Sequence, residues 1–358
     1  MTYKIEELTA GIEGIKPEDF KKYRDYWDSL VHPTGSLGQL EEVGIKLCGI
    51  LGELPAKVSK KAVLVFCNDN GIYEENISSS PRILTDLLAV QMGENKTGVV
   101  ALAENAGADV LVVDLGIEDF KGNEKVLNRR ISNGTKNFMK EDAMTREEAL
   151  EAISIGYDLA CDYIEKGYKV LGTGELGMGN TTTSAAVIRG LTGISEEKVV
   201  GLGSGVTDEQ LANKLRVVRD CLDFRNIDPK DPLGVLQKVG GYDIGAMAGV
   251  YLACGKHKVA GVIDGLISSA GALLAYKLNK NVKDYLFASH IAKETGSKIA
   301  LDQMGLRGYF DLEMRLGEGS GCPLLFRLLD DSLYCMNNMV KFDQTDIINC
   351  LVNIRDKK

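Results

Sequence analysis

The sequence predicts a doubly wound α/β fold with a mainly parallel sheet, joined to a small helical domain. Through the middle of the chain, short apolar runs alternate with longer segments of helical periodicity. This pattern is typical of parallel strands covered by helices on both faces. Both chain ends show helical periodicity without such runs. Glycine-rich segments follow several of the runs, and this is where ligands bind in this fold class.

The chain ends predict the helical domain. Residues 1–55 are charged and periodic, with a break in the Pro-Thr-Gly-Ser-Leu-Gly segment at 33–38. The helices expected there are 4–8, 20–30 and 40–51. The tail, 330–358, returns to helical periodicity and is expected to pack against them. We therefore predict a small helical domain formed by 1–55 plus 330–358, and a large α/β domain formed by 56–329.

The strands and helices of the large domain follow from the apolar runs and their spacing. Five runs are apolar on both faces, as in strands buried between two helix layers. The expected strands are 62–67, 109–115, 168–171, 199–202 and 259–263. Between the runs, apolar residues recur at helical spacing. The expected helices are 147–166, 208–218, 243–254 and 265–276, with a further one beginning at Ser184. Such alternation favours parallel strands connected through helices.

Composition and charge exclude several classes of function. The 358 residues include 42 basic and 51 acidic side chains, giving a net charge of −9. General binding to nucleic acid or to an anionic membrane is therefore not expected. The chain has no apolar run of about 18 residues, which a membrane span needs. Acidic residues also occur early, where a signal peptide would turn apolar, so we expect a cytoplasmic protein.

The eight cysteines and three histidines predict neither a metal centre nor a disulfide framework. The cysteines are spread along the chain without a C-x-x-C pair, whereas zinc sites and disulfide scaffolds need closer spacing. Most of the cysteines lie in apolar runs, and we expect them to be reduced thiols in the core. We expect no metal and no bound cofactor.

The first candidate site is the glycine-rich segment Gly-Thr-Gly-Glu-Leu-Gly-Met-Gly-Asn-Thr-Thr-Thr at 172–183, expected to be a loop between a strand and a helix. Gly172, Gly174 and Gly177 match the dinucleotide-binding fingerprint, but no acidic residue ends the next strand to hold a ribose. Asn180 stands where a P-loop needs lysine. The segment therefore suits a single phosphate held by backbone N–H groups and hydroxyls, or a tight turn with a helix cap.

Two further segments place charged residues near glycines. Gly-Leu-Gly-Ser-Gly at 201–205 precedes a helix that contains Lys214, a residue that either reaches an anion or lies on the surface. Arg-Leu-Gly-Glu-Gly-Ser-Gly at 315–321 sets Glu318 between glycines. Glycines there let the backbone approach a ligand and leave the carboxylate unobstructed. Glu318 is therefore a candidate general base, with a solvated turn residue as the alternative.

The segments at 174–182 and 315–321 together resemble the nicotinate-nucleotide:dimethylbenzimidazole phosphoribosyltransferases of cobamide biosynthesis. Supporting matches extend over nearly the whole chain. They are Pro-Thr-Gly-Ser-Leu-Gly-Gln-Leu-Glu at 33–41, Asn-Asp-Asn-Gly at 68–71, Val-Gly-Gly-Tyr-Asp at 239–243, Asp264-Gly265 and Ser289-His290. The resemblance implies a Rossmann-like domain with a small helical domain built from both chain ends. It also implies a dimer that moves phosphoribose from nicotinate mononucleotide to an aromatic lower-ligand base.

The resemblance implies roles for individual residues. Glu318 would be the general base that takes the N–H proton of an attacking benzimidazole, and Glu175 would support positive charge on the ribose. The other residues implied to bind substrate are Gly177, Gly179, Asn180, Thr181, Thr182, Gly203, Lys214 and Asp264. Those implied for the pocket of the base are Ser80, Gln91 and Met92.

Three alternatives stay open at this point. The acceptor is a phenol in related enzymes that pair two homologous chains, and Asn70 stands here where the family often has His. The chain can instead be a catalytically silent subunit of such a heterodimer, although its intact motifs favour a catalytic homodimer. An NAD-dependent oxidoreductase is the remote third alternative, because only the spacing of Gly172, Gly174 and Gly177 favours it.

Overall fold

The centre of the molecule is a seven-stranded sheet in the order β3-β2-β1-β4-β5-β6-β7, with every neighbouring pair parallel. The computed structural model describes residues 3–203 and 205–347. The strands are β1 Lys61–Asn68, β2 Asp109–Gly116, β3 Leu127–Asn128, β4 Val170–Leu176, β5 Ala260–Ile263, β6 Leu286–His290 and β7 Gly308–Phe310. The first six follow the order of Rossmann-type sheets, in which the ligand crevice lies where the order reverses. Here that point is between β1 and β4.

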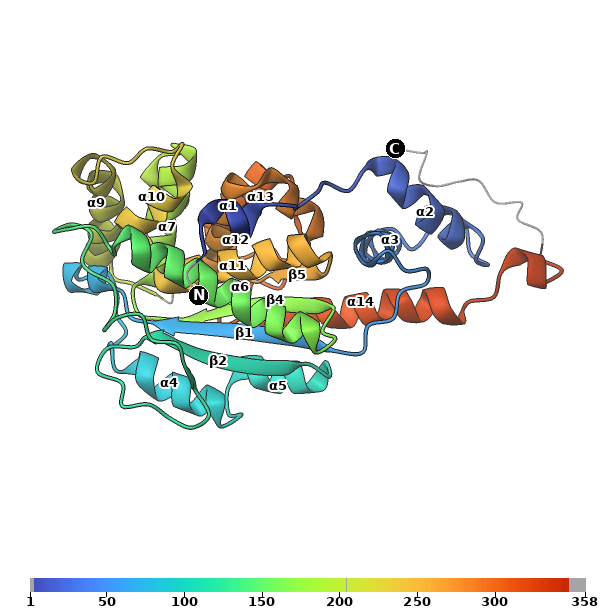
Figure 1. The fold of residues 1–358 in the computed structure, drawn as a ribbon, viewed down its shortest axis with the longest axis horizontal. Helices are drawn as coiled ribbons and strands as arrows, with labels where there is room; N and C mark the ends of the chain where they lie inside the picture. The colour runs from blue at the N-terminus through green and yellow to red at the C-terminus, as the bar shows by residue number, and fades with distance from the viewer. Residues whose placement is uncertain (1–2, 204, 348–358) are drawn as a thin grey trace.

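Helices cover both faces of the sheet, as Figure 1 shows. On one face lie α4 Leu84–Gly93, α5 Gly98–Asn105 and α14 Gly321–Asn338. On the other lie α6 Arg146–Glu165, α11 Tyr242–His257 and α12 Leu266–Leu278. Every residue of β1 and β4 is buried between these layers. This burial explains why the run 62–67 within β1 is apolar on both faces.

The remaining helices surround the carboxyl edge of the sheet or come from the N-terminal segment. Those near the edge are α7 Asn180–Thr192, α8 Glu196–Val199, α9 Asp208–Phe224, α10 Pro232–Val239 and α13 Thr295–Met304. Those of the N-terminal segment are α1 Ile5–Thr9, α2 Lys21–Asp28 and α3 Gln39–Leu51. Short 3₁₀ turns are η1 Pro17–Phe20, η2 Gly71–Glu75, η3 Lys280–Tyr285 and η4 Phe342–Gln344. No helix of the described residues is long and apolar enough to cross a membrane.

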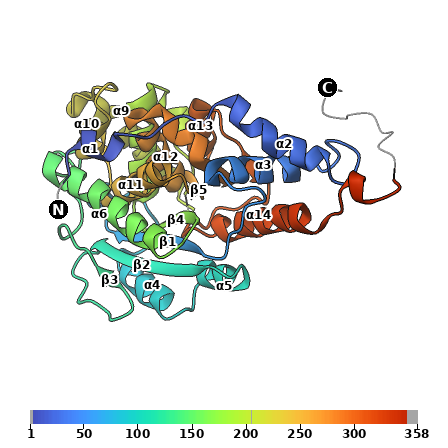
Figure 2. The same ribbon diagram turned by 45° about the vertical axis from the view of Figure 1, so that its right-hand side comes forward.

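The two chain ends meet beside the sheet. In Figures 1 and 2, α2 and α3 lie next to the far half of α14. The N–H of Val31 donates to the carbonyl of Val340 at 2.9 Å, and the Ser332 hydroxyl donates to the carbonyl of Leu40 at 2.6 Å. By contrast, α1 packs on α6 and α11. The domain division at residues 55 and 330 stays a prediction, and residues 348–358 of the predicted tail lie outside the described part.

Two predicted elements are wrong. The apolar run 199–202 is the end of α8 and a loop, because a run of four apolar residues suits the last turn of a helix as well as a strand, and only Val199 and Val200 are buried. The predicted loop at 172–176 is part of β4, which continues through Leu176. Its glycines lie under α14, where a Cβ on Gly172 would come within 2.7 Å of the Cys322 Cβ.

Several elements have different bounds or were not predicted. Helix α7 begins at Asn180 rather than at Ser184. The strands β3 and β7 were missed because they are short, with two and three residues. The five-residue β6 was missed because only its first three residues, Leu-Phe-Ala, are apolar. Seven cysteines lie among the described residues; all are free thiols, five buried and two partly exposed.

Candidate active site

A cavity of about 240 Å³ opens at the carboxyl ends of the strands. Its lining comes from the segments that follow β1, β4, β5, β6 and β7, and from α4 and α9. It therefore occupies the reversal point of the sheet, as expected for a doubly wound fold. Most of the predicted site residues line it: Ser80, Glu175, Gly177, Gly179, Asn180, Thr181, Gly203, Lys214 and Glu318.

Four predicted residues do not line this cavity. Gln91 is exposed on α4 and Met92 is buried behind it. Thr182 is buried within α7, and its hydroxyl has no hydrogen-bond partner among the described residues. Asp264 follows β5 and is only 2% exposed, with both carboxylate oxygens turned to backbone N–H groups. None of these four residues is therefore part of the cavity wall.

Glu175 is the penultimate residue of β4, not a loop residue, and its side chain points into the cavity. One carboxylate oxygen accepts a hydrogen bond from the Asn180 side-chain amide, and the other accepts one from the N–H of Glu318 at 3.1 Å. Burial and the neighbouring Asp243 carboxylate raise the pKa of Glu175 to about 8. Glu175 thus joins β4, α7 and the Glu318 turn through a single side chain.

Glu318 lies at the centre of a turn of three left-handed residues. The φ angles of Gly317, Glu318 and Gly319 are 80°, 61° and 87°. Such a conformation is uncommon for a residue with a side chain and is held by its surroundings. Burial raises the pKa of the Glu318 carboxyl. Among the described residues this carboxyl has no hydrogen-bond or ion-pair partner, so it is free to accept a proton from a ligand in the cavity.

Lys214 is buried rather than on the surface, with 1% of its area exposed. Its ammonium donates to the Thr181 hydroxyl at 3.1 Å and to the carbonyl of Gly201 at 3.0 Å. Burial lowers its pKa. A Cβ on Gly203 would lie 3.3 Å from the ammonium nitrogen. The amine therefore faces the N-terminus of α7, which together with it forms a local positive site suited to a phosphate.

Acidic residues that the sequence-based reasoning did not assign complete the polar part of the site. Glu294 lines the cavity and accepts a hydrogen bond from the N–H of Gly203 at 2.9 Å. Asp243, at the start of α11, is fully buried near Glu175. The sequence did contain a feature that could have identified Asp243, because this residue ends the Val-Gly-Gly-Tyr-Asp match at 239–243. It contained no such feature for Glu294, since nothing in the surrounding sequence places this residue near the glycine-rich segments.

Apolar side chains form the remaining wall. They include Ile77, Leu84, Leu88, Leu176, Met178 and Leu266. Apolar lining with a few placed polar groups is typical of pockets that bind a small organic ligand. No group of three or more histidine, cysteine or acidic side chains among the described residues could hold a metal ion. The cavity thus pairs a positive corner, formed by Lys214 and the N-terminus of α7, with carboxyl groups and an apolar wall, called here the apolar slot.

The buried carboxyls predict how stability depends on pH. Burial raises the pKa of Asp243 from its ordinary 3.8 to about 7. The folded state holds this proton more tightly than the unfolded chain does. Protonation of Asp243 therefore makes its full contribution to the free energy of unfolding below about pH 4, and this contribution is lost as the pH rises towards 7. Asn mimics the protonated form. We expect the urea midpoint of Asp243→Asn, relative to the natural protein, to rise between pH 5 and pH 8.

Urea unfolding at several pH values measures this difference. Glu313→Gln is the control, since Glu313 is exposed and paired with Lys293, which lowers its pKa. Its difference from the natural protein should therefore not rise between pH 5 and pH 8. A constant difference for Asp243→Asn across that range would contradict the assigned pKa.

Comparisons with known proteins agree with this architecture. A family model described as phosphoribosyltransferase matches residues 12–347. A protein of Clostridium tetani, named nicotinate-nucleotide–dimethylbenzimidazole phosphoribosyltransferase, is 44% identical over 355 residues, 98% of each chain. A protein of Clostridioides difficile with the same name is 40% identical over 343 residues, 96% of this chain and 99% of the relative. The crystal structure of CobT from Thermus thermophilus matches with a TM-score of 0.88 and 34% identity, covering 93% of this chain and 99% of that one.

Proposed function

Because this chain belongs to the nicotinate-nucleotide–dimethylbenzimidazole phosphoribosyltransferase family, we propose that it transfers phosphoribose from nicotinate mononucleotide to 5,6-dimethylbenzimidazole or a related lower-ligand base. The products are an α-riboside 5′-phosphate and nicotinate. The observation that carries the proposal is Glu318, a buried carboxyl without a partner among the described residues, which lines a cavity that also holds an apolar wall and the Lys214 ammonium.

Glu318 serves as the general base in this reaction. One ring nitrogen of the benzimidazole attacks the anomeric carbon, and the bond from that carbon to the nicotinate nitrogen breaks. The electron pair of the broken bond leaves with nicotinate. The proton on the other ring nitrogen passes to Glu318, which neutralises the positive charge that the attack creates. Proton transfer to a positioned side chain typically contributes about 10²–10⁴-fold to the rate.

The rest of the cavity supports the two substrates. The ammonium of Lys214 and the N-terminus of α7 suit the 5′-phosphate. The glycosidic nitrogen of nicotinate mononucleotide is cationic, and the lining carboxyl Glu294 suits positive charge on it and on the ribose. Glu175, whose pKa is raised to about 8, suits such a charge in its ionised form. The apolar slot beside Ser80 suits a flat aromatic base. The oxidoreductase alternative is not favoured, because Gly172 and Gly174 lie within β4 and form no dinucleotide loop.

One assay tests the proposed function. Purified protein is incubated with nicotinate mononucleotide and a panel of benzimidazoles and phenols, without NAD, and nicotinate release is followed. We expect release that depends on a benzimidazole acceptor. A folded protein that gives no release with any acceptor would indicate a silent subunit, and release with phenols only would reassign the acceptor.

We also propose a homodimer and a cytoplasmic location. Several large apolar side chains are exposed in or next to the segments that line the cavity: Leu202 and Leu316 line it, and Ile83, Leu87 and Leu312 lie within two residues of lining positions. Apolar groups gathered beside a functional site suit a protein–protein contact. Sedimentation of the purified chain alone measures the assembly. A monomer that gains activity only with a homologous chain would favour the heterodimer instead.

A further inference from the structure

The Glu318 turn needs contacts from other segments to hold its backbone, called here its brace, because its conformation is not one that its own residues favour. Three successive residues adopt left-handed angles, and the middle one carries a side chain. The position of the general base therefore depends on what holds the backbone of this turn. Glu175 holds the first part of the turn through the N–H of Glu318. The second part is held by Asp264.

Both carboxylate oxygens of Asp264 accept hydrogen bonds from the backbone of the turn. One accepts a hydrogen bond from the N–H of Gly319 at 3.0 Å, and the other accepts one from the N–H of Gly321 at 2.7 Å. Burial raises the pKa of Asp264 to about 7, and the hydrogen bonds from Gly321 and Gly319 act in the opposite direction. In the ionised form these hydrogen bonds are roughly twice as strong as neutral ones. Gly321 is the first residue of α14, so the carboxylate also faces the positive end of an 18-residue helix.

The surroundings of Asp264 leave it little freedom. Its own N–H donates to the Ser268 hydroxyl at 2.9 Å. On its other side, the Nδ1 of His290 lies 3.9 Å away and contacts the Ser289 hydroxyl at 2.9 Å. Burial lowers the pKa of His290, which favours a neutral imidazole there. The position of Asp264 directly after β5, with His290 at the end of β6 on its other side, therefore directs its carboxylate towards the turn.

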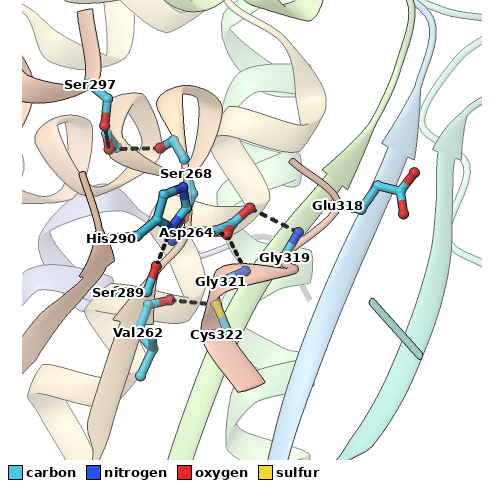
Figure 3. Close-up of polar contacts among 12 residues, drawn as sticks. Val262, Asp264, Ser268, Ser289, His290, Ser297, Glu318, Gly319, Gly321 and Cys322 are labelled. Atoms are coloured by element: carbon cyan, nitrogen blue, oxygen red, sulfur yellow. Dashed lines mark hydrogen bonds and ion pairs between the residues drawn. The ribbon is translucent and has the colours of Figure 1, made fainter. Parts of the chain in front are cut away.

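The fit between the turn and its neighbours is too close for the backbone to shift. A Cβ on Gly321 would lie 2.4 Å from the His290 Nδ1 and 2.7 Å from an Asp264 oxygen. Figure 3 shows Asp264 on one side of the turn and the Glu318 side chain projecting from the other. Asp264 thus acts on Glu318 through the backbone and not by touching its carboxylate.

From these contacts we propose that Asp264 is a positioning residue, which aims the Glu318 carboxylate by fixing the N–H groups of Gly319 and Gly321. This inference rests on the proposed function of Glu318 and replaces the expectation that Asp264 binds substrate. A displacement of about 1 Å in a catalytic group can cost on the order of 10²-fold in rate. Losing the brace should therefore lower kcat without weakening the binding of nicotinate mononucleotide.

The test uses Asp264→Asn, Glu318→Gln and the double variant in the full chain. The side-chain amide of Asn presents N–H to one of the two backbone donors, so one hydrogen bond of the brace is lost. We expect Asp264→Asn to lower kcat by about 10- to 100-fold, with the Kd for nicotinate mononucleotide changed less than about threefold. Because Asp264 acts through Glu318, the double variant should be no slower than Glu318→Gln alone. Single-turnover measurements with enzyme in excess extend the range of measurable rates.

Amide hydrogen exchange supplies a readout that needs no activity. We expect the peptide covering residues 317–322 to exchange at least about tenfold faster in Asp264→Asn, while peptides from α6 stay unchanged. Ser297→Ala is the matched control, because it removes an equally buried hydrogen bond, to Ser269 at 2.9 Å, away from the turn. Ser268→Ala removes the support of the Asp264 N–H, together with contacts to the Thr173 and Tyr251 hydroxyls, but leaves both carboxylate bonds to the turn. It should therefore change the exchange of residues 317–322 less than Asp264→Asn does.

The outcomes separate this inference from the proposed function. An inactive natural protein contradicts the proposed function, and the exchange experiment still tests the brace. An equal loss in Kd and kcat would show that Asp264 contacts substrate directly. Unchanged exchange at 317–322, or a full further loss of rate when Asp264→Asn is added to Glu318→Gln, would overturn the positioning role.

Discussion

Glu318→Gln is expected to lower kcat by about 10²–10⁴-fold, with little change in the KM for nicotinate mononucleotide. Gln has nearly the same shape as Glu and can occupy the same turn, but its amide cannot accept the proton of the benzimidazole. The Glu318 side chain has no hydrogen bond to lose among the described residues, and the residue is 9% exposed. The effect should therefore appear in the chemical step and not in folding or in nucleotide binding. Nicotinate release at saturating substrates measures it.

The control for this variant is Glu313→Gln. Glu313 is also a non-glycine residue at positive φ, 54°, but its side chain is exposed and pairs with Lys293 at 2.7 Å. Its replacement should leave kcat within about twofold of the natural protein. Full activity in Glu318→Gln would remove Glu318 as the general base. An equal loss in both variants would indicate a general effect of changing this loop.

Gly174→Ala is expected to reduce both stability and activity, although alanine is otherwise accepted in a strand. A Cβ at this position would lie 2.3 Å from the carbonyl oxygen of Glu318 and 2.7 Å from its carbonyl carbon. These atoms belong to the backbone of the turn, so they cannot move aside as the end of a side chain can. Overpacking of this kind typically costs about 1–3 kcal/mol. The displaced turn would carry Glu318 away from its position, with a loss of kcat on the order of 10²-fold.

Thermal unfolding and nicotinate release measure the two effects of Gly174→Ala. Gly14→Ala is the matched control, because its Cβ meets only side-chain atoms of Asn281 and Asp284, at 3.3 Å, far from the cavity. It should leave both quantities close to those of the natural protein. A kcat in Gly174→Ala equal to that of the natural protein would show that the turn tolerates a shift. The position of the turn would then not control the action of Glu318.

Much of the fold could be predicted from local pattern. The runs that became β1, β2 and β5 are apolar on both faces because helices cover both sides of the sheet. The short strands β6 and β7 and the end of α8 could not be distinguished in this way. Periodicity does not separate a strand from a helix in runs this short, and only pairing with a neighbouring strand decides between them.

The candidate site was predicted in part. The glycine-rich motifs located Glu318, Glu175 and the α7 N-terminus, because their unusual residue types stand close together in the sequence. The burial of Lys214 was not predicted, since a single lysine in an amphipathic helix looks like a surface residue. Glu294 was missed because it reaches the cavity from a separate segment after β6.

The family, the parallel sheet and the two motifs proposed to carry the chemistry could all be recognised before the fold was known, because they lie in local periodicity and in short runs of residues. The contacts of the glycines and carboxyls became visible only in the folded chain. Gly174 is needed for the close approach of the turn, and Asp264 faces backbone N–H groups more than 50 residues away along the chain. Such contacts depend on how β4, β5 and α14 pack against one another, and a linear sequence carries no distances between distant segments.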